Sequence, residues 1–332
     1  MPTIEPTSVP KRGAPIWLGM LVLYLVWGST YLGIAIAVDS IPPFLMAAAR
    51  FLLAGSILLA WSIAREGRSF IVPTRREWRD SAIVGALLLG GGMGMVAFGE
   101  QTVPSGITAL LIAMMPVWVA ILGGIFLGER LPRVAVVGIA VGFAGVAILA
   151  GPSAFGGAGA LDPLGLAAVL LSPIAWSVGS LFASHRAVLP RRPLVATGLQ
   201  MLLGGLVLTV MATVTDEVAS FDAAAVTRDS LIAFAYLTVI GSLLAFTVYG
   251  WMLRVAPLPL VATYAYVNPV VAVILGWLVL GETIDARTLV AGAVIIFAVA
   301  LIVTARSRMR APVIAAPRPP AVVPAGKPAT TL

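Results

Sequence analysis

The chain has 332 residues, of which 60% are hydrophobic and only 11% are charged. This composition is far outside the range of soluble domains, so a water-soluble globular fold is excluded. The net charge of +7 does not indicate nucleic-acid binding, because the basic residues are confined to particular segments between apolar stretches, and the absence of cysteine excludes disulfides and Cys-ligated metals.

Ten apolar stretches of membrane-spanning length follow one another along the chain. A helix of about 20 apolar residues crosses the ~30 Å hydrocarbon core and satisfies its own backbone polar groups in lipid. The expected spans are residues 17–37, 43–64, 80–99, 105–127, 134–150, 162–184, 194–214, 230–252, 259–280 and 287–305. We therefore expect an all-α integral membrane protein with ten transmembrane helices.

The beginning of the first span resembles a secretory signal peptide. Lys11 and Arg12 precede the apolar run, and Ala35-Ile36-Ala37 has the pattern of a cleavage site. The run is too long for a signal sequence and leads directly into a second span, which favours a helix that is retained in the mature protein.

The fourth and ninth spans share a sequence pattern at a constant offset of 153 residues. Nine of 21 positions match between residues 109–129 and 262–282, including Pro116 with Pro269 and Gly-Glu at the end of each span. Because each half then holds five spans, the second half must cross the membrane in the opposite direction. Inverted repeats are typical of secondary transporters, in which the substrate site lies between the repeats.

This repeat defines the organisation that we expect along the chain. The predicted segments are a cytoplasmic N-terminal segment (1–16), a first five-helix repeat (17–150), an outer linker (151–161), a second five-helix repeat (162–305) and a cytoplasmic tail (306–332). The linker is rich in glycine. The tail holds six prolines in its last 22 residues and few large apolar side chains, which predicts disorder.

Basic residues gather on one side of this topology. With the N-terminus in the cytoplasm, 18 of the 21 Lys and Arg residues fall in inner segments, and the outer loops hold only Arg228 and Arg287. Cytoplasmic loops of membrane proteins carry an excess of Lys and Arg. We therefore expect both termini to lie in the cytoplasm.

Arg50 is the only charged side chain well inside a predicted span. A guanidinium at that depth costs at least ~2.5–3.5 kcal/mol on insertion scales, so it should face the bundle and a partner. As a functional group it would bind the carboxylate of a substrate through two parallel hydrogen bonds. The alternative is a structural contact with loop carbonyls or with Glu100 at the end of the third span.

Aromatic and polar side chains at mid-span predict an amphipathic cavity. Trp27, Trp118 and Trp176 lie away from the span ends that Trp favours, and each indole N–H needs a partner there. For any one of them, simple helix packing is the alternative. The substrate-binding residues that we expect are Arg50, Trp27, Tyr31, Gln101, Trp118, Trp176, Tyr264, Tyr266 and Asn268.

Four further residues are expected to shape helices. Pro116 and Pro269 each remove a backbone hydrogen bond and should kink their spans, acting as hinges or only shaping the helices for packing. Glu129 and Glu282 resemble a carboxylate pair. The inversion places them on opposite membrane faces, so we expect them to cap helix ends or form hairpins.

Enzymatic motifs are absent from the sequence. No HExxH occurs, the one histidine, His185, lies beside an inner loop, and no acidic pair is placed for metal or phosphate chemistry. We therefore expect no catalytic activity, no metal and no cofactor. No carboxylate lies near mid-membrane, where proton-coupled carriers usually keep one, so exchange or facilitated diffusion is as plausible as proton coupling.

Several motifs together resemble the EamA-type permeases of the drug/metabolite transporter superfamily. The residues that carry the resemblance are Trp27–Tyr31, Ala49–Phe51, Val103–Gly106, Ala265–Pro269 and Leu280–Thr283. The resemblance implies a ten-helix inverted-repeat carrier of the bacterial inner membrane that exports amino acids, related metabolites or toxic organic compounds. The second half has Gln200 where the first has Arg50, so an anion site would be one-sided.

The function that we expect is export of amino acids, including methionine, threonine and bulky apolar or aromatic ones, by alternating access. Arg50 with Tyr31 or Gln101 would bind the carboxylate, and the Trp and Tyr residues would hold the side chain. The alternatives are a multidrug exporter of the same architecture and, less favoured, a membrane-embedded enzyme. The expected partners are a small-molecule substrate and the lipid bilayer; the sequence leaves open whether the chain is a monomer or self-associates.

Overall fold

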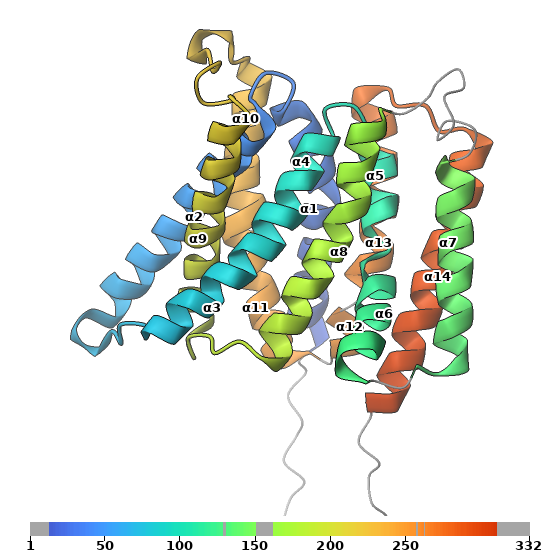
Figure 1. Cartoon of the computed structure of the whole chain (residues 1–332), viewed down its shortest axis with the longest axis horizontal. Coiled ribbons are helices and arrows are strands. Elements are labelled where there is room, and N and C mark those ends of the chain that lie inside the picture. Colours follow the sequence, from blue (N-terminus) through green and yellow to red (C-terminus); the bar gives the residue numbers. More distant parts are fainter. Residues whose placement is uncertain (1–12, 129–130, 151–161, 257, 262, 311–332) are drawn as a thin grey trace, which may run out of the picture.

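The fold is an all-helical bundle, described by a computed structural model for residues 13–128, 131–150, 162–256, 258–261 and 263–310 (Figure 1). Glu129, the linker 151–161 and residues 1–12 and 311–332 lie outside the described residues, so the predictions for these segments stay predictions. Eight helices in the described part are long and apolar enough to cross a membrane, and two apolar helices, Arg133–Leu149 and Tyr264–Leu280, are shorter.

The helices follow one another in the same order in the two halves of the chain. The first half contains α1 (Gly13–Ala37), α2 (Pro43–Glu66), η1 (Gly67–Ser69), α3 (Arg75–Gly85), η2 (Ala86–Gly94), α4 (Met95–Gly99), α5 (Ser105–Ile112), α6 (Met115–Leu127) and α7 (Arg133–Ala150). The second half contains α8 (Pro163–His185), α9 (Pro193–Val214), η4 (Ala223–Ala225), α10 (Arg228–Tyr236), η5 (Leu237–Leu244), α11 (Ala245–Val255), α12 (Leu258–Val261), α13 (Tyr264–Leu280) and α14 (Ala286–Arg310).

Local sequence signals explain where several helices begin and end. Thr74 accepts a hydrogen bond from the Glu77 N–H while Glu77 accepts from the Thr74 N–H, a capping box that starts α3 five residues earlier than we predicted. Thr227, 153 residues later, caps α10 in the same way through Ser230 N. Gly128 and Gly281 end α6 and α13 with φ angles of 65° and 67°, a left-handed conformation that favours glycine.

The third and eighth predicted spans contain a feature that the sequence did not indicate. Both are continuous, but a π-helical stretch, η2 or η5, interrupts the α-helix in each. π-Helical stretches inside α-helices occur frequently at functional sites. In η2 a Cβ atom on Gly91 would lie 2.8 Å from Ala175 Cβ, so this glycine run packs closely against α8.

The fourth and ninth predicted spans are each broken into two helices. The break between α5 and α6 falls at Ala113 and Met114, whereas α12 ends at Val261 and α13 begins at Tyr264. Our prediction that the two prolines kink their spans stays a prediction, but the prolines lie at different places in their helices. Pro116 lies in the first turn of α6, just after the break, where its missing N–H costs little. Pro269 lies inside α13, after the break.

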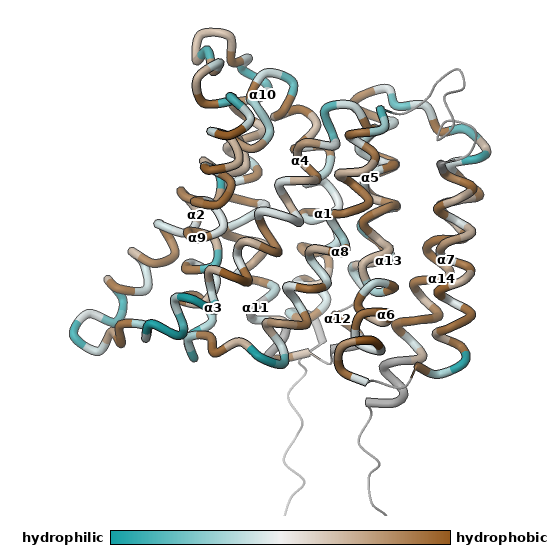
Figure 2. The backbone as a smooth tube through the Cα atoms, viewed as in Figure 1, coloured by the Kyte–Doolittle hydropathy of each residue, from teal (hydrophilic) through white to brown (hydrophobic). Residues whose placement is uncertain are grey.

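The two halves pack against each other along paired helices. α2 packs on α9, α7 on α14, and α1 on α13. Glycines permit the closest approach: a Cβ atom on Gly55 of α2 would lie 2.7 Å from the backbone N of Leu202 in α9. Hydrophobic residues run along most of the length of the helices and polar residues gather at their two ends, as expected for helices surrounded by lipid (Figure 2).

One end of the bundle is defined by the last residues of α1 and α4 and the first residues of α10. Here the Ser230 hydroxyl at the start of α10 donates to the Ile36 carbonyl near the end of α1, and the turn after α4 contacts the start of α8 through Thr102 and Asp162. We name this the Glu100 end; it is the upper end in Figure 1. The opposite end, where α3 begins, is the Arg76 end. α1 and α8 therefore run in opposite directions.

Candidate functional site

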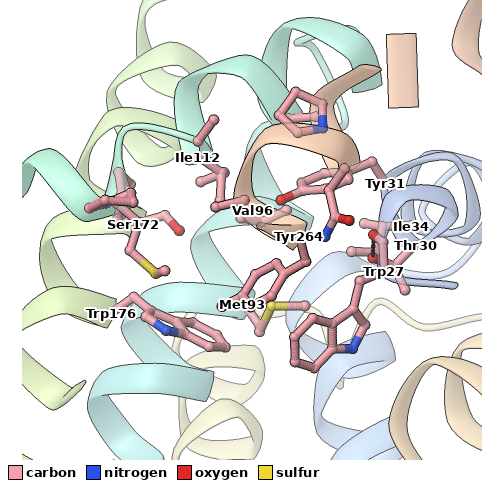
Figure 3. A pocket seen from close by; sticks show the side chains of 18 of the residues that line it. Trp27, Thr30, Tyr31, Ile34, Met93, Val96, Ile112, Ser172, Trp176 and Tyr264 are labelled. Atoms are coloured by element: carbon pink, nitrogen blue, oxygen red, sulfur yellow. Dashed lines mark hydrogen bonds between the residues drawn. The ribbon is translucent and has the colours of Figure 1, made fainter. Parts of the chain in front are cut away.

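A cavity lies between the two halves, at the level of the breaks in the fourth span and the ninth span. Its walls come from α1, α2, η2, α4, α5, α6, α8, α11 and α13. The lining residues are Trp27, Thr30, Tyr31, Ile34, Arg50, Met93, Val96, Ala109, Ile112, Ala113, Met115, Pro116, Ser172, Pro173, Trp176, Phe246, Tyr264, Ala265, Asn268 and Pro269. Figure 3 shows Trp27 and Trp176 on different helices, with Tyr264 between them.

The cavity has a volume of about 110 Å³. A water-sized group needs roughly 10–15 Å³ of such volume, so the cavity holds about eight groups of that size. This is the size of a small organic molecule. The lining is mostly apolar, with a few polar groups, which is the usual composition of a binding site for such molecules.

Arg50 is the cationic group of the cavity wall and is only 2% exposed. Its Nε donates a 2.8 Å hydrogen bond to the Ser242 hydroxyl of η5, in the other half of the chain, and its Cζ lies 4.9 Å from the ring centroid of Phe51. Within the described residues no carboxylate forms an ion pair with Arg50, so the suggested structural pairing with Glu100 is not present. A buried guanidinium without a counterion favours an anionic ligand.

Asn268 supplies the amide of the cavity wall. It lies in α13 directly before Pro269 and is 7% exposed. Its Oδ1 accepts no hydrogen bond from any described residue. A buried amide oxygen without a partner is costly, so a ligand N–H or ammonium group bound at this position would be stabilised.

An aromatic cluster, formed by Trp27, Phe246, Tyr249 and Tyr264, closes one side of the cavity. The Trp27 ring lies 4.9 Å from Tyr264, 5.0 Å from Tyr249 and 5.6 Å from Phe246, measured between ring centroids. Trp27 belongs to the first half and the other three to the second, so the cluster joins the halves. Trp176 of α8 also lines the cavity, as predicted from its position in the sequence.

Three of the predicted site residues do not line this cavity. Gln101 is exposed at the Glu100 end. Trp118 packs edge-on against Phe143 of α7, with ring centroids 5.6 Å apart. Tyr266 packs against the hydrophobic core around α5, α6 and α14. Trp118 and Tyr266 do lie well inside their predicted spans, but the direction in which each side chain points depends on the neighbouring helices, whereas Gln101 lies beyond the end of its span.

Glu282 caps a helix of the other half. Its carboxylate accepts hydrogen bonds from Ser105 N (2.7 Å), the Ser105 hydroxyl (2.7 Å) and Gly106 N (3.1 Å). These donors form the first turn of α5, where N–H groups have no partner inside the helix and the helix dipole favours a negative charge. The end of α13 is therefore held to the start of α5 at the Glu100 end.

Several residues of the site were missed by sequence reasoning. Ile34, Met93, Val96 and Met115 are apolar and carry no signal that separates a cavity wall from core packing. Ser242 lies 192 residues from Arg50, and only the fold brings the two together. In the described part of the chain, no group of three or more His, Cys, Asp or Glu side chains could hold a metal ion.

The match to a known family decides the class of this protein. The model of the EamA-like transporter family matches residues 15–151 and 163–304. The chain belongs to the EamA-like transporter family. EamA-like proteins are transporters and not enzymes, and two matched stretches in one chain indicate duplicated halves.

Relatives of the EamA-like chain support the same class. This chain is 36% identical over 304 residues to the uncharacterized inner membrane transporter YedA of Escherichia coli K12, and the match covers 91% of this chain and 95% of YedA. It is 29% identical over 284 residues to protein PecM of Dickeya dadantii, covering 84% and 88%. A solved crystal structure covers 90% of this chain with a TM-score of 0.59 and 21% identity, which is similarity of fold alone.

Proposed function

We propose that this EamA-like chain exports amino acids and related metabolites across the bacterial inner membrane by alternating access. The observation that carries the proposal is that one cavity contains a binding group for each part of an amino acid. Arg50 suits a carboxylate, Asn268 suits an ammonium group, and the aromatic cluster suits an apolar side chain. The similarity to YedA, an inner membrane transporter, supports the location.

The second part of the proposal is the topology. The two halves act as inverted five-helix repeats, with both termini and the Arg76 end in the cytoplasm. Opposite directions of α1 and α8 support the inversion. Charge supports the orientation, because the Arg76 end carries most of the described arginines, among them Arg65, Arg76 and Arg191, whereas Arg228 and Arg287 lie at the Glu100 end.

The cavity volume bears on the choice of cargo. Space for about eight water-sized groups suits threonine or methionine better than an aromatic amino acid in this conformation. The substrate carboxylate would bind the guanidinium of Arg50, which is already oriented by Ser242. Arg50 belongs to α2 in the first half and donates a hydrogen bond to Ser242 in the second half. Relative motion of the halves would therefore change the position of the guanidinium and its affinity for the substrate.

A multidrug exporter is the second candidate, and the aromatic cluster favours it. The faces of Trp27, Tyr249 and Tyr264 attract organic cations. Arg50 opposes this candidate, because a cationic drug in the same cavity would meet a buried guanidinium and no lining carboxylate. The balance therefore favours zwitterions.

Counterflow in proteoliposomes tests the proposal. Vesicles are preloaded with unlabelled threonine, methionine, phenylalanine or tryptophan at equal pH on both sides, and entry of the labelled amino acid is followed. Transient accumulation above equilibrium is expected for threonine and methionine. If none of the four gives accumulation while organic cations do, the amino-acid function is wrong and the multidrug function is supported.

A further inference from the structure

Glu100 is a buried carboxyl group that the transport site does not use. It follows the last residue of α4 and is 6% exposed. Neither of its carboxylate oxygens has a hydrogen-bond partner among the described residues. An ionised carboxylate without partners is very costly to bury, whereas its protonated form is not. Burial raises the pKa of Glu100, and the nearby Glu282 raises it further.

The charged and titratable groups around Glu100 explain why it would hold a proton. Tyr31 of α1 and Glu282 after α13 both interact with it electrostatically. Thr102 follows Glu100 by two residues, and its hydroxyl donates a hydrogen bond to Asp162 at the start of α8. Arg50 of α2 donates to Ser242 instead. The described surroundings of Glu100 are therefore acidic, with no cation paired to it.

We propose that Glu100 binds a proton, and that this proton stabilises the conformation in which the Glu100 end is closed. In that conformation the Glu282 carboxylate is held against the first turn of α5. A second negative charge on Glu100 would repel Glu282 and favour separation of α13 from α5. Because the closed conformation binds the proton more tightly, the proton must in turn favour that conformation.

The direction of the pH dependence follows from this linkage. Below the pKa of Glu100 the carboxyl group is neutral and the closed end is stable. As the pH rises through that pKa, the proton is lost and the Glu100 end opens more often. Tyr31 lines the cavity and also neighbours Glu100, so the proton site lies one side chain away from the proposed substrate site. The proton site rests on the proposed transport function only in so far as the cavity beside it is the substrate site; it does not depend on which molecule is transported.

Cysteine labelling tests the proposal without any substrate, because the chain contains no cysteine. Thr30 lines the cavity and is 6% exposed, so Thr30→Cys should react with a membrane-impermeant maleimide only when a path to it opens. The rate is divided by that of Val218→Cys, an exposed residue at the Glu100 end, which corrects for the pH dependence of the maleimide reaction with an exposed thiol and identifies the side of the membrane. From the side that labels Val218→Cys, the ratio should rise at least about fivefold from acidic to alkaline pH.

Substitution of the carboxyl group gives the decisive comparison. Glu100→Gln should keep the ratio low at every pH, whereas Glu100→Asp should retain a pH response. Glu217→Gln is the matched control, because Glu217 is a half-buried carboxyl at the same end that accepts a hydrogen bond from Leu45 N. Burial also raises the pKa of Glu217, yet its removal should leave the response unchanged.

Two results would overturn the proposal. One is a labelling ratio that does not change with pH in the chain with native Glu100; this result does not depend on whether any variant folds. The other is a pH response that persists in Glu100→Gln or disappears in Glu217→Gln. Failure of counterflow with every amino acid, together with the expected labelling, contradicts the proposed cargo and supports the proton site.

Discussion

At the scale of single residues, Arg50 is the group on which the transport proposal depends most. It is buried, it lies in the wall of the cavity, and its hydrogen-bond partner is a neutral hydroxyl from the other half. A buried guanidinium retains a strong electrostatic preference for an anion when its partner is neutral. In the proposed function Arg50 would therefore bind the substrate, and its hydrogen bond to Ser242 also joins the two halves.

Replacement of Arg50 should discriminate between substrates. Arg50→Ala should weaken carboxylate-bearing substrates by about tenfold or more, since a hydrogen bond to a charged group is worth about 1.5–3 kcal/mol. Neutral amides of the same amino acids should be affected much less. Half-saturation in counterflow measures both. Arg50→Lys retains the charge but loses the planar guanidinium, so its affinity for carboxylate-bearing substrates should lie between those of the native chain and Arg50→Ala. An equal loss of affinity for acids and amides would show that Arg50 is structural.

Two tryptophans form a matched pair for testing the cavity wall. Trp176 lines the cavity, so Trp176→Ala should enlarge it and shift the ratio of phenylalanine to threonine transport upward by about tenfold. Trp118 packs on Phe143 outside the cavity, so Trp118→Ala should leave that ratio unchanged and lower stability by up to about 3 kcal/mol. Competition counterflow and thermal unfolding measure the two effects. A change of the ratio in Trp118→Ala alone would contradict the cavity assignment.

At the scale of helices, contact between α2 and α9 forms a close junction between the halves. Gly55 allows the backbones to approach so closely that an added Cβ atom would lie 2.7 Å from Leu202 N and 2.8 Å from the Gly198 carbonyl oxygen. Small residues at such contacts are the usual means of helix association in membranes. By contrast, α6 packs mainly on α8 and α5 packs mainly on α13, so the main packing partner of the fourth span changes at its break.

Enlargement of Gly55 should separate α2 from α9. Gly55→Ala places a methyl group against backbone atoms, which cannot move aside as a flexible side chain would, and we expect a loss of about 1–3 kcal/mol. The thermal unfolding temperature in detergent measures it. Ser56→Ala, at the adjacent and exposed position of the same helix, should have little effect. Equal stability of the two variants would show that α2 and α9 do not approach as described.

At the scale of the whole molecule, the chain is a bundle of about ten helices whose outer surface is apolar. Exposed large side chains such as Trp17, Leu53, Phe126 and Phe297 cover that surface over much of the length of the bundle. Hydrophilic residues are concentrated at the two ends (Figure 2). In water such a surface would aggregate, whereas in a bilayer it is solvated by lipid.

The proposed orientation can be tested with one residue at each end. Val218 lies at the Glu100 end and Ile71 at the Arg76 end, and both are exposed. In intact cells with a permeabilised outer membrane, an impermeant maleimide should label Val218→Cys and should not label Ile71→Cys until the inner membrane is opened. The reverse pattern would place the Arg76 end outside and invert the proposed direction of export.

The sequence predicted the helical class well because hydropathy alone determines it. Nearly every predicted span corresponds to a helix or a pair of helices, and burial of Arg50 and Asn268 followed from their depth. The π-helical stretches and the unequal breaks were not predicted, because each depends on contacts between spans distant in sequence. For the same reason Ser242 was missed, and Trp118 was placed in the cavity although its ring lies against Phe143.

The unequal breaks in the fourth and ninth spans have a kinetic consequence. With the offset of 153 residues, the break at Ala113 and Met114 would correspond to positions 266 and 267, but in the second half α12 ends at Val261 and α13 begins at Tyr264. Exchange of the two halves would therefore not regenerate the same molecule, and in the proposed transport cycle the two openings would differ in free energy. When the inward-open and outward-open conformations of the empty carrier are unequally populated, the empty site is exposed more often on one side of the membrane. The cargo concentration that gives half the maximal transport rate would therefore differ between the two faces of the membrane.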